Sequence, residues 1–169
     1  LGRHRKALRR LGRIFSEGLA EKTYWAVLDG VPAASSGRVT APLHKVSTAR
    51  RGWRMVVDAA RGKAATTDYR VMSSDGTVSF VEFSPQTGRT HQIRVHAAEL
   101  GCPVIGDPVY GRHGGPVGPL QLHARRLVLP LYETKPAVVA EAPPPPHMAA
   151  RLAQLPAALD NENSAGSMP

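Results

Sequence analysis

The largest group of side chains that could do chemistry lies in residues 84–96, which read Ser-Pro-Gln-Thr-Gly-Arg-Thr-His-Gln-Ile-Arg-Val-His. Two arginines, two histidines and two glutamines fall across an expected loop and the start of an expected helix. Arg94 follows His91 by three residues and shares its side of the helix, whereas Ile93 points to the core. Arg89 projects from the loop, close to helix N–H groups that attract anions. The spacing predicts a cationic site where a sheet, a loop and a helix meet.

Three kinds of site fit these residues. An arginine here can pair with a buried carboxylate for structural reasons alone, or it can contact a phosphate or a base. The third kind is a metal site built on His91, His96 and His123. Because His91 and His96 are five residues apart, they lie on different faces of a helix, and no acidic residue stands at ligand spacing. The sequence therefore argues against a metal site and leaves the first two open.

Short strands and turns must position this segment. We expect helices at residues 3–17 and from Thr90 to about Leu100, and strands at residues 23–28, 54–58, 69–72, 78–83 and 127–131. Asp75-Gly76 predicts a tight hairpin, whereas the Gly-, Pro- and Ser-rich residues 31–53 predict an irregular excursion. Strands that do not alternate with helices favour an α+β fold with a mixed, mostly antiparallel sheet.

One domain accounts for most of the chain. We expect it to cover residues 1–145, with little order beyond Thr134, and a C-terminal tail at residues 146–169. The tail follows a stiff run of prolines at residues 143–146, and its polar, small end from Asp160 onward predicts partial disorder.

The charge balance points to a polyanionic partner. Lys and Arg number 22 against 13 Asp and Glu, a formal charge of +9 with a sequence pI near 10.4. Arginine supplies most of the cations, and its guanidinium fork matches phosphate oxygens and stacks on bases. Nucleic acid is therefore favoured over a membrane surface, although a GC-rich genome also makes proteins rich in arginine.

Several classes of protein are excluded. The single cysteine, Cys102, excludes a disulfide framework and a multi-cysteine zinc site. Neither an apolar run of about 20 residues nor an apolar signal core after the basic start is present in the sequence. We expect a soluble, cytoplasmic protein that does not act at a membrane.

The longest motif resembles that of a known family. The run from Thr87 to His96, continued by Gly101-Cys-Pro-Val-Ile-Gly-Asp-Pro-Val-Tyr-Gly111, resembles the third conserved motif of the RluA-like RNA pseudouridine synthases. Three further segments agree in order and spacing: the Lys-x-Tyr strand at residues 21–30, the Gly-Lys-x-Ala-x-Thr entry at residues 62–67, and the Leu-His-Ala element at residues 120–124. The resemblance covers roughly residues 5–145.

The resemblance implies an enzyme that isomerises uridines in ribosomal or transfer RNA. The family fold is a mixed α+β domain with helices packed on a mostly antiparallel sheet and an RNA cleft across its middle. The chemistry of the family uses no metal and no organic cofactor. We therefore expect RNA as the partner, ribosomal RNA first and transfer RNA second, and a monomeric protein.

The resemblance also assigns roles to individual residues. Arg94 matches the arginine that pairs with the family's catalytic aspartate, and Tyr24 matches the aromatic residue that packs on the target uracil. Leu122 matches the apolar residue that closes the base pocket. Without the family context, Tyr24 would be an ordinary strand aromatic. The remaining expected substrate-binding residues are Arg89, His91, Gln92 and Lys22.

The catalytic aspartate itself is missing from its expected place. In the family it belongs to a His-Arg-Leu-Asp element ahead of the Lys-x-Tyr strand, but the 23 residues before Tyr24 contain no aspartate. Asp29, Asp75 and Asp107 stand at a strand end, a hairpin tip and the motif tail, and none takes the role by position. We expect a fragment whose longer parent is active and which is itself inactive. The alternatives are a non-catalytic RNA-binding remnant of the fold and an unrelated basic, β-rich, ribosome-associated protein.

Overall fold

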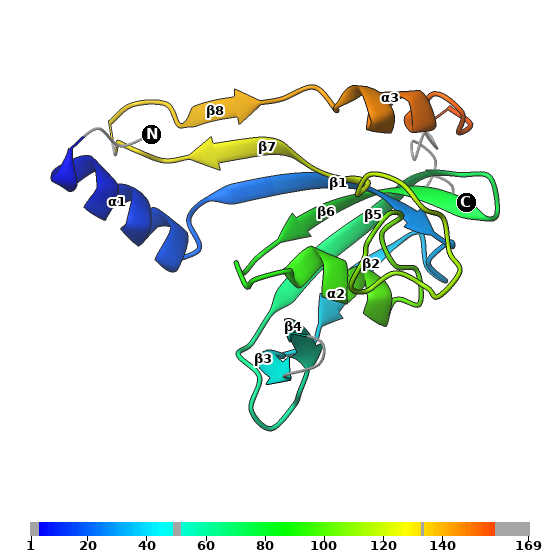
Figure 1. Cartoon of the computed structure of the whole chain (residues 1–169). Coiled ribbons are helices and arrows are strands. Elements are labelled where there is room, and N and C mark those ends of the chain that lie inside the picture. The colour runs from blue at the N-terminus through cyan, green and yellow to red at the C-terminus, as the bar shows by residue number, and fades with distance from the viewer. Residues whose placement is uncertain (1–3, 49–51, 133, 158–169) are drawn as a thin grey trace, which may run out of the picture.

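One antiparallel sheet organises the molecule (Figure 1). The computed structural model describes residues 4–48, 52–132 and 134–157. The strand order is β2-β5-β6-β1-β7-β8, and every neighbouring pair is antiparallel. The strands of this sheet are β1 (Glu21–Asp29), β2 (Ser36–Thr40), β5 (Thr66–Ser74), β6 (Val78–Pro85), β7 (Leu122–Leu129) and β8 (Val138–Glu141). The predicted α+β class is confirmed.

Helix α2 (Gln92–Glu99) packs on one face of the sheet (Figure 1). Strand β6 alternates buried and half-buried side chains, and its Phe83 is fully buried. Phe83 belongs to the same core cluster as Leu28 of β1 and as Ile93 and Ala97 of α2. The predicted inward face of this helix is therefore confirmed. The helix begins at Gln92 rather than at Thr90, for a reason that lies in the site itself.

The C-terminal part is more ordered than the sequence suggested. Helix α3 (Pro146–Leu152) follows β8, and its Met148 is fully buried against Val27 and Ile105. Val27 alternates with Ala26 and Leu28 along β1, so α3 packs on the sheet face opposite α2. The expectation of little order beyond Thr134 is therefore wrong for β8 and α3. The domain boundary at residue 145 stays a prediction, and the predicted disorder from Asp160 onward falls outside the described residues.

Residues 31–53 are not an irregular excursion. They contain β2, and they contain β3 (Leu43–Thr48), which pairs with β4 (Gly52–Val57) in a separate two-stranded sheet. The pair of β3 and β4 lies below α2 in Figure 1. The predicted turn at Asp75-Gly76 is confirmed, since Gly76 has φ of 93° and Asp75 Oδ1 accepts the N–H of Thr77 and Val78.

Helix α1 (Arg5–Ser16) confirms the N-terminal prediction, although much of its apolar stripe is exposed. Ile14 is buried, whereas Leu8 and Phe15 are exposed. The predicted strand at residues 127–131 and the Leu-His-Ala element before it overlap one continuous strand, β7 (Leu122–Leu129). Among the described helices, none is long and apolar enough to cross a membrane.

A buried histidine makes the stability of this fold depend on pH. His96 Nδ1 lies 2.8 Å from Thr67 Oγ1, and its Nε2 lies 3.1 Å from the Ala41 carbonyl oxygen. Burial lowers the pKa of His96, although the bond to Ala41 and the charge of Glu99 act in the opposite direction. The unfolded chain therefore takes up a proton below a pH of about 6.5 that the folded chain resists. Stability should be full above that pH and should fall as the pH drops below it.

We predict that the urea midpoint decreases between a pH of about 7.5 and about 5.5. His96→Gln should reduce this dependence, whatever it costs in absolute stability, and His91, whose pKa is lowered too, accounts for part of what remains. The matched control, His113→Gln, changes an exposed loop histidine and should leave the slope as it was. A slope that His96→Gln does not alter would contradict the assignment.

Candidate active site

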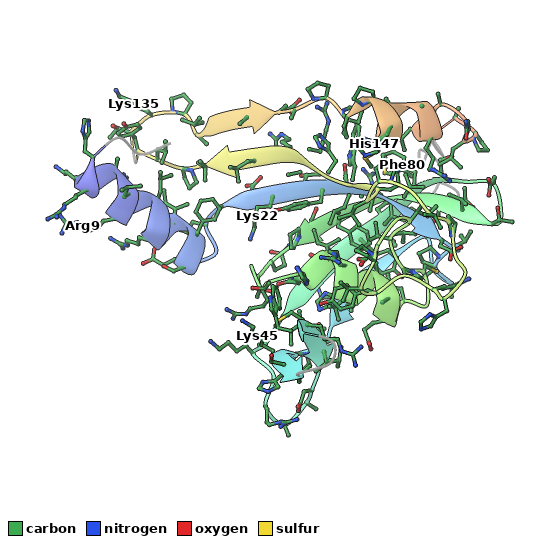
Figure 2. All side chains as sticks on the ribbon, viewed as in Figure 1. Arg9, Lys22, Lys45, Phe80, Lys135 and His147 are labelled. Atoms are coloured by element: carbon green, nitrogen blue, oxygen red, sulfur yellow. The ribbon has the colours of Figure 1, made fainter. Side chains whose placement is uncertain are left out.

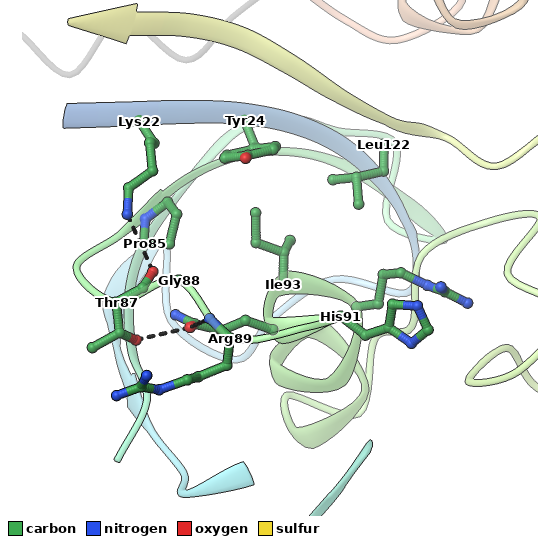
Figure 3. Close-up of a pocket in the computed structure, with 11 residues that line it drawn as sticks. Lys22, Tyr24, Pro85, Thr87, Gly88, Arg89, His91, Ile93 and Leu122 are labelled. Carbon is green, nitrogen blue, oxygen red and sulfur yellow. Dashed lines mark hydrogen bonds between the residues drawn. The ribbon is translucent and has the colours of Figure 1, made fainter. Parts of the chain in front are cut away.

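The seven predicted site residues line one cavity of about 260 Å³ (Figure 3). Two neighbouring strands, one loop and the start of α2 form it. Strands β1 and β7 supply Lys22, Tyr24 and Leu122, and the segment from Pro85 to Arg94 supplies the rest. The β1–β7 register pairs Ala26 with Leu122 and Tyr24 with Ala124, which sets Tyr24 and Leu122 side by side. The sequence therefore named residues that the fold brings together, and the complete lining adds Pro85, Thr87, Gly88 and Ile93.

The interior of the cavity is largely apolar. Tyr24, Leu122 and Ile93 point into it from β1, β7 and α2 (Figure 3). Ile93 was predicted as a core residue only, and it both packs in the core cluster and borders the cavity. The volume is slightly below the roughly 300–1,000 Å³ of typical small-molecule sites. It suits a single flat ring, with Tyr24 available to stack on it.

Gln92 holds the loop in place. Its Oε1 accepts hydrogen bonds from the Thr87 hydroxyl at 2.8 Å and from the Arg89 N–H at 2.9 Å. Its Nε2 donates to the Thr66 carbonyl at 3.0 Å and to Thr67 Oγ1 at 2.9 Å. Gln92 is buried, so these bonds fix the path of residues 86–92 against β5. Its geometry fits a positioning role better than the direct substrate contact that the sequence suggested.

Arg94 has a partner within the chain. Its Nε and Nη2 donate to the two carboxylate oxygens of Asp107 at 2.7 and 2.6 Å. The Arg94 side chain is 13% exposed and that of Asp107 is 0% exposed. Asp107 Oδ1 also accepts the N–H groups of Val109 and Tyr110. The structural alternative, an arginine paired with a buried carboxylate, is therefore realised at a residue that also lines the cavity.

The surroundings of this pair favour the charged form of both side chains. The hydrogen bonds that Arg94 donates to Asp107 raise the pKa of Arg94 above its ordinary value. Burial by itself raises the pKa of Asp107, but the hydrogen bonds from Arg94, Tyr110 and Val109 and the charge of Arg94 outweigh it and leave the pKa lowered. Gly106, with φ of 75°, has no room for a Cβ, which would meet Pro119 O at 2.4 Å. A tight turn thus presents Asp107 to Arg94.

His91 connects the cavity to the β3–β4 hairpin. It adopts a left-handed conformation with φ of 53°, which ends the loop and delays the start of α2 to Gln92. The Tyr110 hydroxyl accepts the Met55 N–H at 2.9 Å, which leaves its own O–H free to donate to His91 Nδ1 at 3.0 Å. The His91 ring stacks on Trp53 of β4, with centroids 5.0 Å apart. Burial, then the charge of Arg94, lowers the pKa of His91, so the ring is neutral near pH 7.

Two more cations border the cavity. Lys22 Nζ donates to the Thr87 carbonyl at 3.3 Å, and burial lowers the pKa of this lysine. Arg89 is exposed and donates from Nε to the Ala64 carbonyl at 3.0 Å. Each therefore keeps N–H donors for an anionic ligand at the rim of the cavity.

The structure does not gather the three histidines of the metal alternative. His91 bonds to Tyr110, His96 to Thr67 and Ala41, and His123 to the Ala142 carbonyl. Across residues 4–48, 52–132 and 134–157, no group of three His, Cys, Asp or Glu side chains is placed to hold a metal ion. No aspartate or glutamate of these residues lines the 260 Å³ cavity.

Comparison with known proteins adds a family to this geometry. A family model described as RNA pseudouridylate synthase matches residues 1–99. An uncharacterised RNA pseudouridine synthase of Zymomonas mobilis is 46% identical over 147 residues, covering 86% of this chain and 66% of that protein. The ribosomal large subunit pseudouridine synthase C of Rickettsia conorii is 42% identical over 103 residues, covering 60% of this chain and 34% of that protein. The chain thus spans less than two thirds of the length of these relatives.

Solved structures show the same architecture. Human RNA pseudouridylate synthase domain containing 1 matches with a TM-score of 0.74 and 32% identity, covering 88% of this chain and 65% of that chain. Human RNA pseudouridylate synthase domain containing 4 matches with a TM-score of 0.72 and 27% identity, covering 89% and 67%.

Proposed function

Because this chain belongs to the RNA pseudouridylate synthase family, we propose that its cavity receives one uridine of a structured RNA for isomerisation to pseudouridine. The resemblance to the RluA-like enzymes is thereby confirmed. The observation that carries the proposal is the convergence of Tyr24, Leu122 and Arg94 on one cavity, each from a different element.

The cavity suits a nucleotide taken out of its stack. A base inside an RNA helix cannot reach a pocket between a sheet and a helix, so the target must be flipped out. Tyr24 then stacks on one face of the uracil, while Leu122 and Ile93 border its other sides. Lys22 and Arg89 at the rim meet the negative phosphates of the flanking nucleotides. These side chains bind and orient the base.

The chemistry needs a carboxylate beside this base. The N1–C1′ bond of uridine breaks, the uracil rotates, and a C5–C1′ bond forms while one proton leaves C5 and N1 gains one. The product is an isomer of the substrate, so the reaction consumes no oxidant, reductant or group donor. Two N–H donors of Arg94 are used by Asp107. The remaining donors can hold a second carboxylate ionised and oriented, as a nucleophile or base requires.

A second candidate function rests on the lining of the cavity. Since no carboxylate of the described residues borders it, the 169 residues alone fit an RNA-binding unit that does not catalyse the isomerisation. The two candidates separate on activity: pseudouridine formation by the longest reading frame that encodes this chain would support the first, and RNA binding by that reading frame without pseudouridine formation would support the second.

We propose large-subunit ribosomal RNA as the substrate, with transfer RNA as the alternative. The support is that relatives from Rickettsia conorii and Zymomonas mobilis carry the names ribosomal large subunit pseudouridine synthase C and D. We also propose that the protein acts in the cytoplasm as a monomer, since residues of a single chain supply the described lining of the cavity.

The test is a pseudouridine map of ribosomal and transfer RNA from cells with and without the gene. We expect at least one pseudouridine of large-subunit RNA to disappear on deletion and to return with the longest reading frame. An unchanged map in both RNA classes would contradict the catalytic function.

Tyr24→Ala should weaken binding of a stem-loop that carries the mapped uridine by about 1–3 kcal/mol, the usual contribution of one stacked base. Tyr24→Phe keeps the ring and should bind within about twofold of the wild type, since stacking does not need the hydroxyl. Fluorescence anisotropy measures both. Equal affinities for the Ala and Phe variants would show that the ring does not contact a base.

A further inference from the structure

Helix α1 carries a basic face that the cavity does not use. Arg5, Lys6, Arg9, Arg10 and Arg13 fall within about 140° of the helix circumference at 3.6 residues per turn. All five are exposed. Arg13 pairs with Glu17 at 2.8 Å, but within the described part of the chain Arg5, Lys6 and Arg9 have no carboxylate at ion-pair distance. Figure 2 shows Arg9 projecting from the outer side of this helix.

The opposite side of α1 fixes the direction of this basic face. Ile14 is buried, and Ala7 and Leu11 are half-buried against the domain. An amphipathic helix docked by its apolar side must present its polar side to solvent. Packing of the apolar side therefore directs the cations toward solvent. Because the helix is about 18 Å long, the cations are spread over that distance.

The loop after β7 extends the basic face. Tyr132 is 51% exposed, and the Arg10 guanidinium lies over its ring at 5.3 Å from the centroid. Lys135 Nζ lies over the same ring, also at 5.3 Å. Figure 2 places Lys135 and Arg9 at the same end of the molecule. Basic side chains around an exposed aromatic ring are typical of surfaces that bind nucleic acid, where phosphates and bases are contacted together.

A second cavity lies between the first cavity and Phe15 of α1. It measures about 350 Å³ and is lined by Phe15 of α1, by Lys22 and Tyr24, and by residues of β7 and β8. Lys22 and Tyr24 line both cavities. A strand that leaves the first cavity therefore has a hollow path past Tyr24 toward α1.

We propose that Arg5, Lys6, Arg9 and Arg10 of α1, with Tyr132 and Lys135, form an RNA-docking surface, here called the α1 surface. It holds the phosphodiester backbone of the strand that extends from the target nucleotide. The choice of RNA as the occupant rests on the proposed function.

Charge complementarity supports this occupant over an anionic lipid surface. Three of the four α1 cations are arginines, whose planar forks match phosphate oxygens. A membrane-binding helix needs a continuous apolar side free to enter the lipid, whereas here Ile14 is buried and Leu11 is half-buried, which leaves only Leu8 and Phe15 of that side exposed. The second cavity also reaches α1 at Phe15, so the path from the target nucleotide ends at this helix.

The test compares two triple variants with the same net charge. Arg5→Gln, Arg9→Gln and Arg10→Gln remove three cations of the α1 surface. Arg38→Gln, Arg61→Gln and Arg70→Gln remove three exposed arginines that pair with Asp68, Asp58 and Glu82 elsewhere. The probe is the stem-loop with the mapped uridine and a single-stranded 3′ or 5′ extension, titrated at about 50 to 200 mM KCl.

The α1 variant should lower the slope of log affinity against log salt by about 2, because each lost single-strand phosphate contact removes about 0.7. The control variant should bind the extended stem-loop more tightly than the same stem-loop without its extension. The α1 variant should bind both with equal affinity. Equal slopes for the two triple variants would overturn the proposal. Loss of binding to phosphatidylserine-containing vesicles with an unchanged RNA slope would also overturn it, in favour of a lipid surface.

Failure of this proposal is distinguishable from failure of the proposed function. If the first cavity does not receive uridine, Tyr24→Ala and a uridine-to-cytidine change in the loop will leave affinity unchanged, whereas the α1 variant will still lower the salt slope. If the α1 surface does not bind RNA, the salt slope will stay the same while Tyr24→Ala still weakens binding.

Discussion

Arg94→Lys in the longest reading frame that encodes this chain is expected to reduce pseudouridine formation at least about a hundredfold. Arg94 Nε and Nη2 donate to Asp107 at 2.7 and 2.6 Å, and the other donors of the guanidinium stay available for the proposed reacting carboxylate. A lysine ammonium is a single point and lacks the planar fork needed to orient two carboxylates at once. RNA affinity should change little, because Arg94 is one of 22 Lys and Arg residues. Single-turnover assays on the mapped stem-loop measure the rate, and anisotropy measures the affinity.

Arg89→Lys is the matched control. Arg89 borders the same cavity, but it is exposed and makes one hydrogen bond from its side chain, to the Ala64 carbonyl. Its replacement should leave the single-turnover rate within a few-fold of the wild type. Near-normal turnover by Arg94→Lys, or equal losses in the two variants, would contradict the role given to Arg94.

Asp107→Asn is expected to cost about 3–5 kcal/mol of unfolding free energy, since it removes one partner of a buried ion pair and leaves the other charge uncompensated. The amide oxygen of the introduced asparagine can still accept the N–H groups of Val109 and Tyr110, so the turn is kept. The measured loss of stability therefore reports the removal of the negative charge. Urea unfolding near pH 7 measures it. Asp68→Asn, which breaks the much more exposed pair with Arg38, should cost far less.

The pH dependence provides a second check on Asp107. Its pKa is lowered in the folded chain, so its contribution is full above the unfolded value of about 3.8 and is lost as the pH falls through the lower folded value. Stability below a pH of about 4 should therefore depend less on pH in Asp107→Asn than in the wild type. An Asp107→Asn variant as stable as Asp68→Asn would show that the pair contributes little.

Local sequence predicted the part of the site that is contiguous in the chain. Arg89, His91, Gln92 and Arg94 lie within one motif, and His91 and Arg94 line the same cavity as their spacing suggested, although His91 lies in the loop ahead of α2 and not on the helix. The start of α2 was misplaced because long-range bonds, from Gln92 to β5 and from His91 to Tyr110, overrode the local capping preference of Thr90.

The site residues that distant segments contribute could not be predicted from local sequence pattern. Lys22, Tyr24 and Leu122 were named through the family resemblance, because the pairing of β1 with β7 cannot be read from either strand alone. Asp107 stood in the quoted motif, yet its pairing with Arg94 depends on a turn at Gly106 that spacing does not specify.

Some short strands were missed for a different reason. All four side chains of β8 are exposed, so it shows no alternation of buried and exposed residues, and backbone pairing with β7 stabilises it. Strands β2 and β3 lie among glycines, prolines and serines. These residues favour turns, so the short strands between them were predicted as irregular structure.

The most direct test of the account is a photo-crosslink from the target nucleotide. A stem-loop with 4-thiouridine at the mapped position is bound to the chain, irradiated, and digested for mass spectrometry. If the cavity receives the base, the label should lie on the β1 peptide that contains Tyr24 or on the β7 peptide that contains Leu122, and Tyr24→Ala should reduce it. Label confined to other peptides, with none on β1 or β7, would contradict the account.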